Sequence, residues 1–94
     1  MTEKTPALVV DKASIAALIV IEEEIRLAET ASDVPDAELS ARLKTALDEV
    51  EREAEGLSHE DMIELIDEAA AGATGDLSPA LAVVSKMLRA RATN

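Results

Sequence analysis

Apolar residues recur along most of the chain at the spacing of one helix face, which becomes visible when residues are placed at about 100° per position. Residues favoured as helix N-caps precede these segments. Asp11, Ser58 and Ser78 precede three of them, and Asp33 or Asp36 is the expected cap of the other. The predicted helices cover residues 12–31, 35–55, 59–71 and 79–91. We therefore predict an all-α protein, a small bundle of about four helices.

Each of the three later helices carries one apolar stripe, so each is expected to bury a single face. The stripe of 35–55 contains Leu39, Leu43, Ala46, Leu47, Val50 and Ala54. The stripe of 59–71 contains Met62, Ile63, Leu65, Ile66 and Ala69, and that of 79–91 contains Leu81, Val83, Val84, Met87 and Leu88.

The first helix differs because it carries two apolar stripes. The first stripe contains Ala17, Leu18, Ile21, Ile25 and Ala28, with Ile15 at its edge. The second contains Ala16, Val20 and Leu27, and charged residues separate the two. A helix with two apolar stripes needs two neighbours, so this helix is either the centre of the bundle or part of an oligomer interface. For the interface alternative, we expect Leu18, Ile21 and Ile25 to face the core and the second stripe to meet a partner.

The ends and the boundaries indicate one domain. Residues 1–11 are expected to be an N-terminal arm, with "TPALVV" extended or in a short strand, and residues 12–94 a single helical domain. The N-terminus lacks a basic region followed by a long apolar run, and residues 13–21 are too few to cross a membrane. We therefore expect a soluble cytoplasmic protein that does not bind membranes.

Composition limits how this core can be stabilised. The chain has no cysteine, which excludes disulfides and thiolate metal sites, and it has no Phe, Trp or Tyr. A short chain with an aliphatic core gains from association with another chain. A homodimer is therefore the expected assembly.

The net charge of the chain limits which kinds of molecule it is expected to bind. The net charge is −11, and residues 22–76 alone contain eighteen acidic and four basic residues. Direct contact with nucleic acid is disfavoured because each phosphate contact needs a cation. The candidate acidic surface consists of Glu22, Glu23, Glu24, Asp48, Glu51 and Glu55. Such a surface keeps the protein soluble, imitates nucleic acid phosphates, docks on a basic protein or binds divalent cations, and the sequence leaves these alternatives open.

Searches for catalytic and metal-binding motifs fail on spacing. His59-Glu60 begins like the zinc motif H-E-x-x-H, but Ile63 stands where the second histidine is needed. Calcium-loop and phosphate-loop patterns lack their essential residues as well, and His59 is expected to be solvent-exposed. We predict no catalytic, cofactor-binding or metal-ligating residue, and therefore no enzymatic activity.

Two functions remain from the sequence. The leading one is a non-enzymatic protein-interaction module, such as a small acidic adaptor, chaperone or inhibitor that self-associates. The alternative is an acidic inhibitor that imitates nucleic acid and blocks a nucleic-acid-binding protein, of the kind that phages encode. The partner itself is not indicated by any motif.

Overall fold

The computed structural model describes residues 6–30 and 36–92 of the 94-residue chain. Within these ranges the chain forms four α-helices and no strand, which confirms the predicted all-α class. The helices are α1 (Pro6–Thr30), α2 (Ala37–Glu53), α3 (His59–Gly72) and α4 (Leu77–Ala92).

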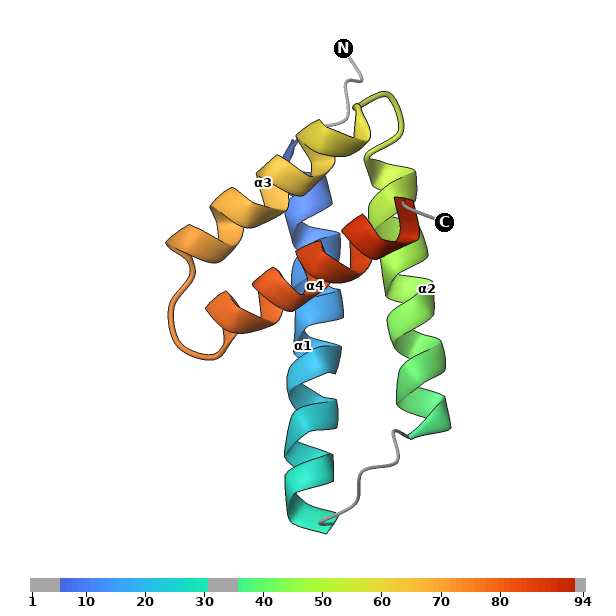
Figure 1. Cartoon of the computed structure of the whole chain (residues 1–94), viewed down its shortest axis with the longest axis vertical. Helices are drawn as coiled ribbons and strands as arrows, with labels where there is room; N and C mark the ends of the chain where they lie inside the picture. Colours follow the sequence, from blue (N-terminus) through green and yellow to red (C-terminus); the bar gives the residue numbers. More distant parts are fainter. Residues whose placement is uncertain (1–5, 31–35, 93–94) are drawn as a thin grey trace.

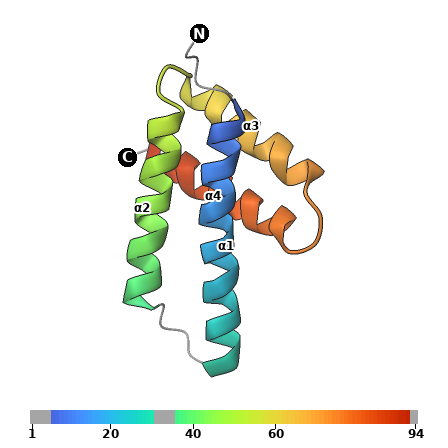
Figure 2. The same cartoon turned by 180° about the vertical axis from the view of Figure 1, so that it is seen from behind.

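Helices α1 and α2 run antiparallel, and the α3–α4 hairpin crosses one side of this pair (Figure 1). Helix α1 packs against each of the other three helices, so it is the centre of the bundle. The hairpin covers only the N-terminal part of α1, whereas the C-terminal part has α2 alone as its neighbour (Figures 1 and 2). This arrangement decides which residues of α1 are buried.

The start of α1 differs from the sequence prediction. The helix begins at Pro6, a residue type that is well tolerated in a first helical turn because it lacks only an N–H group that has no helical partner there. Asp11 is therefore an exposed residue inside the helix and not its cap. Residues 6–11 of the expected arm belong to α1, and Val9 is buried in the core. Residues 1–5 lie outside the described part.

The caps of α2 and α3 confirm the sequence prediction. The Asp36 carboxylate accepts hydrogen bonds from the backbone N–H groups of Glu38 (2.7 Å) and Leu39 (3.4 Å). The Ser58 hydroxyl accepts one from the N–H of Asp61 (3.0 Å). Each bond satisfies an N–H group that has no partner within the helix.

Helix α4 begins one residue before Ser78, which the sequence had suggested as its cap. The Ser78 hydroxyl instead donates a hydrogen bond to the backbone carbonyl of Ala70 at 2.7 Å. This bond joins the start of α4 to the end of α3 and holds the hairpin together. The prediction was wrong because the partner of this hydroxyl is distant in sequence.

The core is aliphatic, and the stripes predicted for α2, α3 and α4 supply most of it. The fully or nearly fully buried members are Leu39, Leu43, Ala46, Leu47, Val50, Ala54, Met62, Ile63, Ile66, Leu81, Val84 and Leu88. Leu65, Ala69, Val83 and Met87 are partly buried against the same cluster. Periodicity alone therefore identified the inner face of these three helices.

Two serines of α4 provide a matched test of the packing. Ser85 is buried and its hydroxyl has no hydrogen-bond partner, whereas Ser78 donates to Ala70. Because an unpaired buried hydroxyl is destabilising, Ser85→Ala should raise the free energy of unfolding by about 1 kcal/mol. Ser78→Ala should lower it by about 1 kcal/mol. Urea denaturation of both variants checks the two signs, and a loss of stability in Ser85→Ala would contradict the first.

Candidate functional site

The burial of the α1 stripes differs from what the interface alternative predicts. Ala16 and Val20, two of the three expected partner-interface residues, are 0% and 5% exposed within the chain itself. Leu27, the third, is half-buried. Of the three residues expected to face the core, Leu18 and Ile25 are 58% and 52% exposed, whereas Ile21 is half-buried against the core. Ala17 of the same stripe is fully buried. The assignment of the stripes to core and surface is therefore corrected.

The reversal follows from the N-terminal extension of α1. The α3–α4 hairpin crosses α1 in its N-terminal part (Figure 1), where Val9 and Ala13 continue the stripe of Ala16 and Val20. Val9, Ala13, Ala16 and Val20 belong to one buried cluster with residues of the other three helices. A helix that begins after Asp11 does not contain Val9, so the stripe of Ala16 and Val20 is longer in the structure than the sequence predicts.

The exposed side of α1 has a regular pattern. Seven exposed residues follow one another at alternating steps of three and four positions, and we call them the α1 seam. They are Leu8, Asp11, Ile15, Leu18, Glu22, Ile25 and Glu29. A repeat that averages 3.5 residues is the spacing at which one helix lies along another. Seen from behind, α1 has no other helix in front of it (Figure 2).

The α1 seam borders a groove between α1 and α2. The groove has a volume of about 530 Å³, and Ile15 and Ile19 form its α1 side. The α2 side consists of Glu38, Ala41, Arg42, Thr45, Ala46 and Glu49. Ile15 belongs to both the seam and the groove, so the two form a continuous surface with an apolar centre and charged edges.

The predicted acidic surface is divided between two places. Lys12 of α1 lies 3.2 Å from Glu49 of α2, which sets residues 48–55 beside the N-terminal part of α1. Residues 22–24 begin ten positions further along α1, or roughly 15 Å at 1.5 Å per residue. The six acidic residues therefore do not form one patch.

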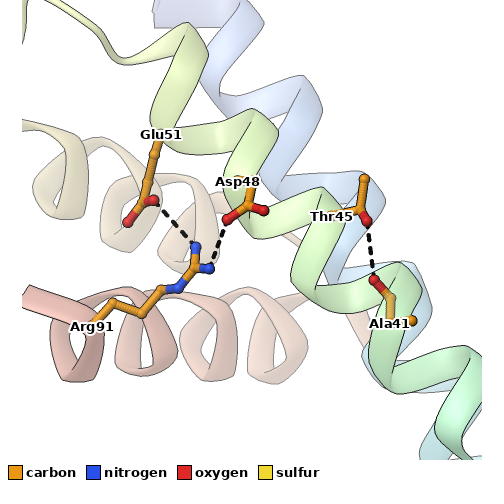
Figure 3. A network of polar contacts seen from close by, with 5 residues as sticks. All are labelled: Ala41, Thr45, Asp48, Glu51 and Arg91. Atoms are coloured by element: carbon orange, nitrogen blue, oxygen red, sulfur yellow. Dashed lines mark hydrogen bonds and ion pairs between the residues drawn. The ribbon is translucent and has the colours of Figure 1, made fainter.

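Part of this acidic surface is paired within the chain. Arg91 of α4 reaches across to α2, where its guanidinium lies 2.7 Å from Asp48 and 3.2 Å from Glu51 (Figure 3). Of the other four residues, Glu22, Glu24 and Glu55 are exposed and Glu23 is half-buried. Arg91 thus reduces the negative charge that α2 presents.

Added salt tests how these charges affect folding. The ion pairs Lys12–Glu49, Arg89–Asp67 and Arg91–Asp48 are all partly exposed, and pairs of this kind contribute little to stability. Repulsion within residues 22–76 should therefore dominate. Raising NaCl from about 10 to about 150 mM should increase the melting temperature. A decrease, measured by circular dichroism, would show that the ion pairs outweigh the repulsion.

A second groove lies at the α3–α4 side. It has a volume of about 350 Å³ and is lined by His59, Glu60, Ile63, Glu64, Asp67 and Arg89. His59 is exposed in the first turn of α3, as the sequence predicted. Arg89 pairs with Asp67 at 2.7 Å, which closes one side of the groove. The remaining polar side chains of the groove are those of His59, Glu60 and Glu64.

No group of three or more His, Asp or Glu side chains within residues 6–30 and 36–92 is placed to hold a metal ion. None of the helices there has the length and hydropathy that crossing a membrane requires.

The chain has no match among known protein families, curated proteins or solved structures. The α1 seam is therefore the feature on which a functional argument rests. The 3–4 spacing from Leu8 to Glu29 is present in the sequence. Its full length follows only from the start of α1 at Pro6, which the sequence did not predict.

Proposed function

We propose that the chain is a non-enzymatic protein-interaction module that binds a protein partner through the α1 seam. The observation that carries this proposal is the exposure of Ile15, Leu18 and Ile25, each close to half exposed on one face of one helix. Single exposed apolar residues are common on protein surfaces, whereas an aligned set is typical of interaction sites. Adaptors, chaperones and inhibitors all act through such surfaces.

The size of the apolar contribution is consistent with specific but moderate binding. Full burial of a leucine or isoleucine side chain is worth roughly 1.5–3 kcal/mol. Because these three side chains are about half exposed, covering them adds roughly half of that value each. The total must offset the entropy lost on association, so contacts in the neighbouring groove or charge pairs are also needed.

The alternative, an acidic inhibitor that imitates nucleic acid, is supported by the net charge of −11. The pairing of Asp48 and Glu51 with Arg91 weakens it, because a phosphate mimic needs carboxylates that remain available to the cations of its target. The separation of residues 22–24 from 48–55 weakens it further. The interaction module is therefore the better-supported proposal.

Two pairs of substitutions distinguish these functions in a pull-down from the lysate of the source organism. Leu18→Gln with Ile25→Gln removes exposed apolar surface without changing charge, while Asp48→Asn with Glu51→Gln removes charge without changing α1. We expect the first pair to lose a partner that the second retains. Part of the binding should persist in high salt, because apolar burial is not screened. The opposite pattern, with steep salt dependence, would support the inhibitor instead.

Self-association is one form of the proposed function. A homodimer through the α1 seam would bury the same three apolar residues on both copies. Sedimentation velocity of the wild type and of the Leu18→Gln, Ile25→Gln variant tests it. A wild-type dimer that this variant converts to a monomer identifies the partner as a second copy.

A further inference from the structure

We infer that the occupant of the α1 seam is a cationic amphipathic helix of another protein, with Lys or Arg placed opposite the acidic seam positions. This inference rests on the proposed function, since it names the partner of the same surface. It is carried by the arrangement of charge within the seam, and not by the overall acidity of the chain.

The seam places acidic residues between apolar ones along a single line. Leu8, Ile15, Leu18 and Ile25 are apolar, and the remaining three positions are Asp11, Glu22 and Glu29. A helix that covers the apolar positions must also approach the three carboxylates. Removing a carboxylate from water without a compensating partner is strongly unfavourable. The partner therefore needs positive groups at the same spacing.

The basic residues of α1 do not meet this need. Lys12 is held by Glu49 at 3.2 Å, and the Nε atom of Arg26 lies 3.8 Å from the carboxylate of Asp36. Both interactions join α1 to α2 or to its N-cap residue, so these cations are paired with carboxylates other than those of the seam. Within the described residues, no ion pair involves the three seam acids. Their charge is available to a partner.

A second copy of the chain fits the seam poorly. In a parallel pair each acidic residue would face its own counterpart. The antiparallel register that matches Leu8 with Ile25 and Ile15 with Leu18 sets Asp11 against Glu22. Either arrangement brings like charges together within the contact, which disfavours association. Each copy also carries a net charge of −11.

The groove beside the seam adds apolar surface to it. Ile15 and Ile19 form its α1 side. On its α2 side Glu38 is accompanied by Arg42, and Glu49 is paired with Lys12 at 3.2 Å. The groove is therefore not uniformly acidic, and the need for cations in the partner rests on Asp11, Glu22 and Glu29 of the seam.

Designed peptides test the inference with the full-length chain. One peptide is an amphipathic helix of about four heptads, with Leu opposite the apolar seam positions and Lys opposite the acidic ones. This peptide is made with two residue orders, one that matches the seam when the peptide runs parallel to α1 and one that matches it when the peptide runs antiparallel. A second peptide replaces these Lys residues with Glu, and a third has the cationic composition in scrambled order. Fluorescence anisotropy should show binding of a cationic patterned peptide and at least about tenfold weaker binding of the other two.

Matched charge variants locate the contact. Asp11→Asn, Glu22→Gln and Glu29→Gln together should weaken binding of the cationic peptide about tenfold, as expected for three exposed charge pairs. The control is Glu60→Gln, Glu64→Gln and Glu68→Gln on α3, which removes the same charge from exposed positions. It should change the affinity by less than about threefold, because distant surface charges are screened.

The outcomes separate failure of this inference from failure of the proposed function. Equal binding of the anionic or scrambled peptide, or equal losses in the two charge variants, overturns the cationic helix. A wild-type dimer that Leu18→Gln with Ile25→Gln dissociates, without peptide binding, also overturns it but supports the interaction module. Peptide binding that is insensitive to Leu18→Gln with Ile25→Gln overturns both, because the seam is then not the surface used.

Discussion

Replacing Val20 with glutamate is expected to unfold the chain, whereas Leu18→Glu on the same helix should leave it folded. Val20 is buried against the core and Leu18 is mostly exposed. Forcing an unpaired carboxylate into the interior costs several kcal/mol, which is comparable with the 5–15 kcal/mol that typically separates folded from unfolded domains. Adding Leu27→Glu to Val20→Glu should not restore folding.

Circular dichroism during heating measures both variants under the same conditions. We expect Val20→Glu to lose its helical signal at room temperature and Leu18→Glu to melt within a few degrees of the wild type. The reverse result, an unfolded Leu18→Glu with a folded Val20→Glu, would mean that the stripe of Leu18 and Ile25 forms the core after all.

The second large effect is expected for Ile66→Ala in α3. Ile66 has no exposed surface and belongs to the hydrophobic core cluster, which contains no aromatic side chain. Truncating a buried isoleucine leaves a cavity and should lower the free energy of unfolding by about 2–5 kcal/mol. The loss is a large fraction of the stability available to a chain that has no aromatic residue to fill space.

Ile25→Ala is the matched control, because it removes the same atoms from an exposed position of α1. It should cost less than about 1 kcal/mol, since much of its side chain is already in water. Urea denaturation gives the free energy of unfolding of both variants when the two curves are fitted with the same dependence of that free energy on urea concentration. If both variants lost a similar amount of unfolding free energy, the finding that Ile66 is buried and Ile25 exposed would be contradicted.

Features that depend on neighbours in sequence were predictable. The inner faces of α2, α3 and α4 follow from a helical period in which one stripe is apolar and the rest is polar. The caps formed by Asp36 and Ser58 follow from a side chain that reaches an N–H group two or three residues later. Exposure of His59 follows from its place beside a cap.

Features that depend on distant partners were not predictable. Ser78 resembles a cap, but its hydroxyl is bound to a carbonyl eight residues earlier in a different helix. The pairing of Arg91 with Asp48 and Glu51 joins α4 to α2, so the charge left on the acidic surface depends on the packing of these helices (Figure 3).

The sequence by itself determined that α1 has two apolar stripes and therefore two environments. Only the tertiary structure decided which stripe is inside. The α3–α4 hairpin crosses the N-terminal part of α1 (Figure 1), and the stripe that continues through Val9 and Ala13 is covered. Of the other stripe, Ala17 and Ile21 pack in or against the core, whereas Leu18 and Ile25 stay exposed. Covering either stripe removes apolar surface from water, so hydrophobicity alone does not predict which of the two is buried. The position of the crossing helices decides which stripe is buried, and that position is set by residues far along the chain.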